Sequence, residues 1–390
     1  MISLLCHYNK NRREHYEKKL LTTSCVLASL SFSTFAVDVS TSIKTGIDSN
    51  PYLLSELHSP DNANFVNTEI HAGHKFKSGV SLYASWLNNN YEDGFDDADK
   101  VKFSLGASFK NKGELFNTNI SYKLDAQFEN QDKTYISRAK GVVGTIGGIA
   151  VGNRYDYDIF ATEGDLKFLW SKPVYFGFSF DTRLKKYEDY TDIGASNLDY
   201  KHLSLKAYMK YKANKNHSLS AYYRFRNRVY EDRLGKDEQG NSVEGTSLEY
   251  DYHMSQITWG FDLTKKQDIQ AYIYFEKRND NVSGYYDTTW QRARLRYRNN
   301  ISKKQKVATQ ITYKDYSYDI NDQLSSIEGE DPINSKEGFQ FELSYAYKIG
   351  NSAGLNWWFN TSFSYEDYDS ADPLYVYDRT FAYAGLEVAL

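Results

Sequence analysis

Residues 101–110 have the sequence VKFSLGASFK, in which every second side chain is apolar. Successive side chains of a β-strand point to opposite faces of its sheet, so a strand with this sequence has one apolar face and one polar face. The apolar face carries Val101, Phe103, Leu105, Ala107 and Phe109. Lysine, serine and glycine occupy the positions between them. The stretch therefore predicts an amphipathic strand about ten residues long.

The same alternation recurs in residues 116–129, 174–184 and 339–349. Segments of this length can cross a bilayer as tilted strands. The alternative is a soluble β-sandwich, but sandwich strands are usually shorter, and strands near 15 residues would overrun a core made by two sheets. The pattern therefore favours a transmembrane sheet whose apolar face meets lipid and whose polar face lines a lumen.

The connections between these segments alternate in length. Short ones, such as residues 77–79 (KSG) and 111–113 (NKG), contrast with long acidic ones, such as residues 48–62 and 232–244. Short turns at one rim and long loops at the other are typical of membrane barrels. We therefore expect an all-β chain folded as a transmembrane, antiparallel, up-and-down β-barrel of about 18 strands. The alternative is 16, because glycines within residues 134–170 obscure the alternation.

Composition is consistent with one large domain. The 390-residue chain has 35 Tyr and only 5 Pro, and it contains no Pro-rich or Gly/Ser-rich linker. After the N-terminus no apolar run approaches 18 residues, which excludes membrane-spanning helices there. Alternating strands average to a low hydropathy even in a membrane barrel. We expect residues 37–390 to form a single outer-membrane β-barrel domain.

The first 36 residues resemble a secretory signal peptide. Lys18 and Lys19 precede a short apolar core at residues 20–32, and small residues around Ala36 suit a signal peptidase. We expect cleavage after Ala36 and delivery to the cell outer membrane. An acylated Cys25 would be the alternative of a lipoprotein.

Cleavage after Ala36 would remove both cysteines of the chain, Cys6 and Cys25. Disulfides, thiolate metal sites and cysteine nucleophiles are then excluded from the mature chain. The peptide carries five basic and two acidic residues, so the formal net charge changes from −4 to −4 − 5 + 2 = −7. This mild acidity does not favour binding to nucleic acid.

The C-terminal segment carries a resemblance to a known class. Its apolar set is Ala382, Ala384, Leu386, Val388 and Leu390. Porins and related outer-membrane barrels end in such an alternating strand that closes on an apolar residue. With the signal peptide and the alternating connections, the chain resembles these proteins over its whole mature length. The resemblance implies contact with outer-membrane lipid and lipopolysaccharide, and leaves the oligomeric state open.

Two segments place arginines on the polar face. Residues 220–230 (SAYYRFRNRVY) and 289–299 (TWQRARLRYRN) carry arginine at every second position. The planar guanidinium matches carboxylate, sulfate or phosphate, and lumen tyrosines suit stacking on sugar rings. The predicted pore-lining residues are Arg183, Tyr222, Arg224, Arg226, Arg228, Tyr272, Tyr274, Arg278, Arg292, Arg294, Arg296 and Arg298. The lining resembles that of porins for acidic oligosaccharides. The alternative is that these arginines pair with Glu276 or Glu342 and simply fill the barrel.

These features predict a porin-like channel for passive diffusion of small solutes, with a preference for anionic or saccharide ones. The alternative is an export barrel for a surface polysaccharide or another product, which would work with separate periplasmic partners. We do not expect an enzyme, because the eight histidines are scattered and none lies in a recognisable catalytic constellation. No motif for a cofactor or a metal ion is present.

Overall fold

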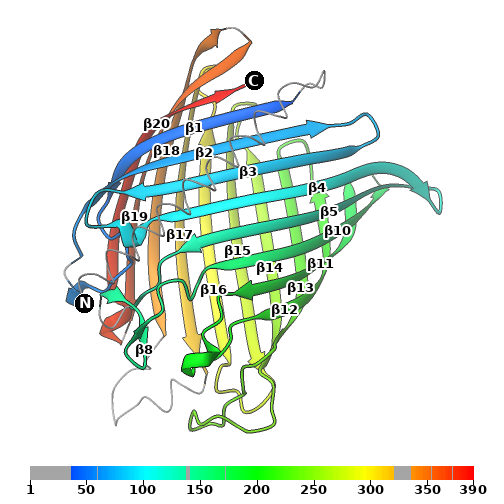
Figure 1. Cartoon of the computed structure of the whole chain (residues 1–390). Coiled ribbons are helices and arrows are strands. Elements are labelled where there is room, and N and C mark those ends of the chain that lie inside the picture. Colours follow the sequence, from blue (N-terminus) through cyan, green and yellow to red (C-terminus); the bar gives the residue numbers. More distant parts are fainter. Residues whose placement is uncertain are drawn as a thin grey trace.

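Sixteen antiparallel strands form a closed barrel in the computed structural model (Figure 1). The structure describes residues 37–58, 60–137, 141–171, 173–319, 335–352, 354–370 and 372–390. Each barrel strand pairs with its neighbours along the chain, and the last strand pairs with the first. Closure satisfies backbone hydrogen bonds within the wall, as a bilayer requires. The expected signal peptide lies outside the described residues.

The barrel strands are β1 (Asp38–Asp48), β2 (Ala63–Lys75), β3 (Val80–Tyr91), β4 (Lys100–Leu115), β5 (Thr118–Lys133), β10 (Tyr157–Ser171), β11 (Val174–Tyr187), β12 (Tyr200–Lys212), β13 (His217–Tyr230), β14 (Glu249–Asp262), β15 (Gln267–Asp280), β16 (Thr288–Asn299), β17 (Gln305–Tyr318), β18 (Lys336–Ser352), β19 (Leu355–Ser370) and β20 (Tyr377–Ala389). Short 3-10 helices lie in the long connections: η1 (Glu56–His58), η2 (Asp96–Ala98), η3 (Thr191–Ile193) and η4 (Pro373–Tyr375).

The glycine-rich segment after β5 does not cross the barrel. It forms two small sheets, β6 (Ile136–Ser137) with β7 (Val142–Val143), and β8 (Thr145–Ile146) with β9 (Ile149–Ala150). Gly141, Gly147 and Gly148 have φ values of 64°, 56° and 84°, a region that favours glycine, and they let the chain reverse direction. Expecting 18 strands was therefore wrong, and the alternative of 16 is confirmed.

Long and short connections alternate as expected. The long ones follow β1, β3, β5, β11, β13, β15, β17 and β19, so all of them lie at one rim, here called the loop rim. The turns that follow the other strands lie at the opposite rim, here called the turn rim. Among the described residues, no helix is long and apolar enough to span a membrane.

One expected turn was placed wrongly. Residues 111–113 belong to β4, which continues to Leu115, where it pairs with Thr118 of β5. The turn is formed by Phe116 and Asn117, with φ values of 50° and 58°. A two-residue hairpin loop of this kind needs positive φ at both central positions, which Asn tolerates better than other non-glycine residues. Lysine and glycine in residues 111–113 therefore did not mark the reversal.

The outer face of the wall is apolar. Leu105, Phe178, Ile273 and Leu295 expose 50% or more of their surface: 52%, 59%, 70% and 50% respectively. So much exposed apolar surface around a closed sheet is typical of contact with lipid. The side chains at the intervening positions point into the lumen, where the polar groups gather.

Candidate functional site

The two arginine rows lie on the face opposite the exposed apolar side chains. One row is on β13 and the other on β16, and two strands, β14 and β15, separate them. Their neighbours Tyr223 and Leu295 are half-exposed on the outer face. Within a strand, alternate arginines are about 6.6 Å apart, because each residue adds about 3.3 Å.

The guanidinium groups pack against aromatic rings. The Arg292 guanidinium carbon lies 5.0 Å from the ring centres of both Tyr274 and Trp290, and that of Arg294 lies 4.2 Å from Tyr272. In the row on β13, the guanidinium carbon of Arg228 lies 4.4 Å from the centre of the Tyr200 ring. Ring faces attract cations, so these contacts hold the arginines against the wall without neutralising them.

Carboxylates pair with only part of the arginine set. Arg298 contacts Asp268 at 2.9 Å, and Arg183 and Arg224 each approach Asp181 at 3.9 Å. Within the described ranges, no carboxylate forms an ion pair at 4.0 Å or less with Arg226, Arg228, Arg278, Arg292, Arg294 or Arg296.

The two glutamates considered as partners bond to neutral groups instead. The hydroxyl of Tyr274 donates to Glu276, and Nε2 of Gln310 donates to Glu342 at 2.7 Å. An arginine–glutamate network that fills the barrel is therefore absent from the described part of the lumen.

Buried tyrosines form a floor between the rows. Tyr250 and Tyr252 of β14 pack with Tyr272 and Tyr274 of β15 in one cluster, each exposed by 6% or less. Tyr272 and Tyr274 are among the predicted pore-lining residues, whereas Tyr250 and Tyr252 are not. The sequence shows Tyr250 and Tyr252 two positions apart, as on one face of a strand, but the acidic residues beside them suggested the base of a loop.

Arg278 holds a loop rather than standing free. Its Nε and Nη2 donate to the carbonyl oxygen of Tyr286 at 2.9 and 2.7 Å, and its guanidinium carbon lies 4.7 Å from the Tyr250 ring. The backbone between β15 and β16 is thereby tied to the lumen wall. Arg278 thus differs from the other predicted pore-lining arginines.

His202 and Asp181 form a buried pair that the sequence did not reveal. Nε2 of His202 lies 2.7 Å from Oδ1 of Asp181, across the β11–β12 pairing. This carboxylate is the one that Arg183 and Arg224 approach. The two residues are 21 positions apart in the sequence, so only the strand register brings them together.

The lumen wall contains two cavities, one near each rim. One, of about 540 Å³, lies at the loop rim and is lined by Trp290, Arg292, Lys314, Tyr316, Tyr318, Lys336, Tyr368, Tyr375 and Tyr377. The other, of about 490 Å³, lies at the turn rim, and its lining includes Lys110, Lys123, Lys167, Lys206, Lys210, Tyr208, Tyr222 and Asp165. We call them the outer pocket and the inner pocket. Lys110 lies on the polar face that the alternation of residues 101–110 predicts to line the lumen.

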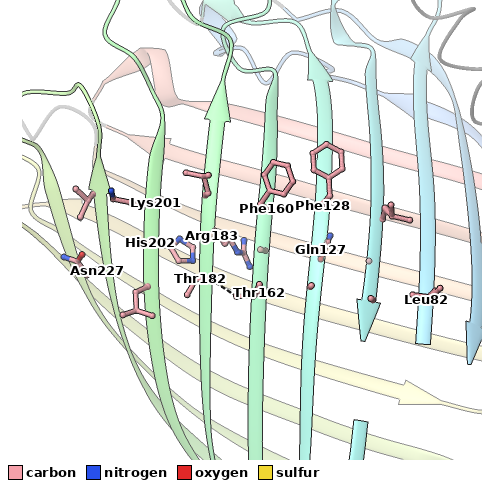
Figure 2. Close-up of a pocket in the computed structure, with 18 residues that line it drawn as sticks. Leu82, Gln127, Phe128, Phe160, Thr162, Thr182, Arg183, Lys201, His202 and Asn227 are labelled. Atoms are coloured by element: carbon pink, nitrogen blue, oxygen red, sulfur yellow. Dashed lines mark hydrogen bonds between the residues drawn. The ribbon is translucent and has the colours of Figure 1, made fainter. Parts of the chain in front are cut away.

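A further hollow, of about 1080 Å³, is floored largely by small outer-face residues. Ala107, Ala126, Thr162 and Thr182 are directly opposed on neighbouring strands, and the two threonine hydroxyls lie 2.8 Å apart. Figure 2 shows Phe128 and Phe160 side by side above this floor, with ring centres 5.0 Å apart. The exposed apolar side chains at its edge belong to the lipid-facing surface, so we do not assign this hollow to the lumen site.

No protein-family model matches the chain, and no curated protein matches it. Among solved structures it is similar to a bacterial polysaccharide outer-membrane secretin, with 9% identity, a TM-score of 0.47, and coverage of 92% of this chain and 99% of that one. It is also similar to Pseudomonas aeruginosa OccK3 (OpdO), with 10% identity, a TM-score of 0.44, and coverage of 91% and 95%. OmpT of Vibrio cholerae gives 10% identity, a TM-score of 0.43, and coverage of 92% and 98%.

The barrel itself shows the fold. The sheet is closed and antiparallel, its outer face is apolar, and long loops and short turns occupy opposite rims. Such a wall suits a bilayer, because its backbone is paired and its outer side chains are apolar. The chain is a transmembrane β-barrel with the closed, antiparallel architecture of porins.

Proposed function

We propose that the barrel is a passive channel that favours anionic solutes, including anionic saccharides. The observation that carries the proposal is the set of lumen-face arginines that pack on tyrosine rings and lack carboxylate partners among the described residues. A positive lumen wall raises the local concentration of anions.

The chemistry of the lining supports the same preference. Arginine presents parallel donors that fit carboxylate and phosphate groups, and it remains charged at all relevant pH values. Arg292 and Arg294 have such donors beside Tyr272 and Tyr274. Trp290 is only partly buried, and its ring centre lies 5.0 Å from the guanidinium carbon of Arg292. Its ring suits the apolar face of a sugar, which would let an anionic saccharide bind better than a simple ion.

The proposal is tested by changing Arg292, Arg294 and Arg296 together to Gln. In planar bilayers with a salt gradient, the reversal potential of this variant should shift away from anion preference, because three lumen charges are lost. The matched control is Lys201→Gln, which removes a cation from the exposed outer face of β12. An unchanged reversal potential in a folded triple variant would contradict the proposal.

A further inference from the structure

The hollow of about 1080 Å³ on the lipid-facing surface, here called the lipid-side hollow, follows a line of directly opposed residues. The line runs across six neighbouring strands, from Leu82 of β3 through Ala107, Ala126, Thr162 and Thr182 to Leu203 of β12. Its four middle members have short side chains, which leave space above the sheet. The lipid-side hollow is therefore a narrow strip of small residues laid obliquely across the outer face.

This strip descends from the loop rim into the bilayer. Leu203 is the fourth residue of β12, which starts at the loop rim, whereas Leu82 is the third residue of β3, which starts at the turn rim. The line crosses five strand boundaries, which is about 24 Å at about 4.8 Å per strand. With strands tilted by about 40°, it covers a height of about 15 Å. One leaflet of a hydrocarbon core has about this thickness, because the whole core measures about 30 Å.

Large apolar side chains border the strip on its loop-rim side. Leu105, Phe128, Phe160 and Leu184 are directly opposed on neighbouring strands, and all of them line the hollow. Figure 2 shows the rings of Phe128 and Phe160 on this side, standing above the strip. A flexible hydrocarbon chain that lies on the strip would contact apolar groups along this whole border.

The opposite side is apolar as well. Leu124 and Phe180 belong to the next outer-face line toward the turn rim, with Gly164 directly between them. A Cβ added to Gly164 would lie 2.2 Å from Cε1 of Phe180, so this ring lies across the backbone of β10. The strip itself carries two hydroxyl groups, of Thr162 and Thr182, which bond to each other at 2.8 Å. Their mutual bond lowers the cost of placing hydroxyl groups against hydrocarbon.

A cation and an amide lie at the loop-rim end of the hollow. Lys201 and Asn227 line it there, and Figure 2 shows them at one end and Leu82 at the other. Nδ2 of Asn227 donates to Asp251 at 2.9 Å. Lys201 is exposed, and within the described ranges no carboxylate forms an ion pair at 4.0 Å or less with it.

The neighbouring outer-face lysine differs from Lys201 in this respect. Lys186 forms ion pairs with Asp199 at 3.0 Å and with Glu231 at 2.8 Å. Its charge is thus neutralised by the protein, whereas that of Lys201 is available to a ligand. An ammonium group at the depth of the lipid head groups attracts phosphate.

We propose that the lipid-side hollow binds an acyl chain of lipopolysaccharide and that Lys201 contacts a phosphate of its lipid A head group. Long loops of outer-membrane barrels face the outside, so the Lys201 end faces the leaflet that carries this phosphorylated glycolipid. The strip of small residues receives the chain over the depth of that leaflet. The site lies outside the lumen, so it is independent of the proposed channel function.

The test titrates the full-length, folded protein in detergent with purified lipid A and counts bound lipid by native mass spectrometry. Lipid A should bind at least about tenfold more tightly than phosphatidylglycerol. Ala126→Phe should weaken lipid A binding by about tenfold or more, because its ring fills the strip. Lys201→Gln should weaken it about fivefold, the effect of one lysine beside an anionic head group. Ala107→Leu is a second, milder way to fill the strip, and migration of the unboiled protein on a detergent gel confirms that each variant is folded.

The matched control for the ring is Ala384→Phe on the outer face of β20. Ala384 lies seven residues from the loop-rim end of its strand, as Ala126 does, and it pairs with Thr45 and Thr361, away from the hollow. The control for the charge is Lys277→Gln, because the outer-face Lys277 forms an ion pair with Asp319 at 3.7 Å. Both controls should bind lipid A like the wild type.

Three results would overturn the proposal. The first is a folded wild type that retains no lipid A or binds phosphatidylglycerol equally well. The second is an equal loss of binding in Ala126→Phe and Ala384→Phe, which would show that no defined site exists. The third is a dimer that Ala126→Phe abolishes while lipid A binding stays unchanged, which would assign the hollow to a second copy of the chain. Because Lys201 points away from the lumen, its effect on lipid binding is a separate readout from ion selectivity.

Discussion

Nε of Arg379 on β20 donates to Oδ1 of Asp48 on β1 at 2.8 Å, so an ion pair spans the seam at which the last strand meets the first. The hydroxyl of Tyr91 also donates to Asp48, at 2.7 Å. The Asp48 side chain is fully buried. A buried carboxylate that loses its cation is strongly destabilising, so this pair ties barrel closure to two residues far apart in the sequence.

We predict that Arg379→Gln destabilises the closed barrel by about 3–5 kcal/mol, because Asp48 would remain buried without a cation. The measurement is the temperature at which the unboiled protein loses its fast migration on a detergent gel. Arg298→Gln is the control, since its partner Asp268 is more exposed and the pair contributes about 1 kcal/mol or less. Equal melting of the two variants would argue against a special role for the seam pair.

On the outer face, Phe178→Arg should hinder membrane insertion by about 2–4 kcal/mol if the site lies at mid-bilayer. Phe178 is 59% exposed on the lipid-facing side of β11. Ser344→Arg, on the lumen side of β18, adds the same side chain where water is present and should insert normally. Insertion is measured as heat-modifiable protein in the outer-membrane fraction. If Phe178→Arg gave a folded, water-soluble protein, the assignment of the two faces would be inverted.

Arg278→Gln should loosen the connection between β15 and β16 without opening the barrel. The change removes two hydrogen bonds to the carbonyl oxygen of Tyr286 and the contact with the Tyr250 ring. Limited proteolysis of the folded variant should cut within residues 281–287 faster than in the wild type. Arg296→Gln is the control, because Arg296 bonds only to Gln270 within the described residues. Identical cleavage rates would show that Arg278 does not hold the loop.

Alternation along single segments was enough to predict the barrel and its apolar outer face. Leu105 and Phe178 are exposed on the outer face, as the alternation of apolar and polar residues predicts. The path of the chain could not be predicted where backbone conformation, rather than the side-chain pattern, determines it. Gly141, Gly147 and Gly148 reverse the chain in a segment that was expected to contain further strands. The turn at Phe116 and Asn117 likewise carries no strong local signal.

The candidate site was less predictable because it depends on strand register. The sequence places Arg292 and Tyr222 on the polar faces of their own strands. Only the pairing of four strands places them in one line across the sheet. Ion pairing is also a property of register: Glu276 was considered as a partner for arginine, yet it accepts a hydrogen bond from Tyr274 on its own strand. The pore-lining role of the arginines remains a prediction.

The most direct test of the account is the ion selectivity of the wild-type channel at low and high salt. The Debye length falls from about 30 Å at 0.01 M to about 3 Å at 1 M, so fixed lumen charges act across the pore only at low salt. If Arg224, Arg226, Arg292, Arg294 and Arg296 line an open lumen, the channel should prefer anions at low salt and lose most of that preference at high salt. A channel that prefers cations at low salt would contradict the account.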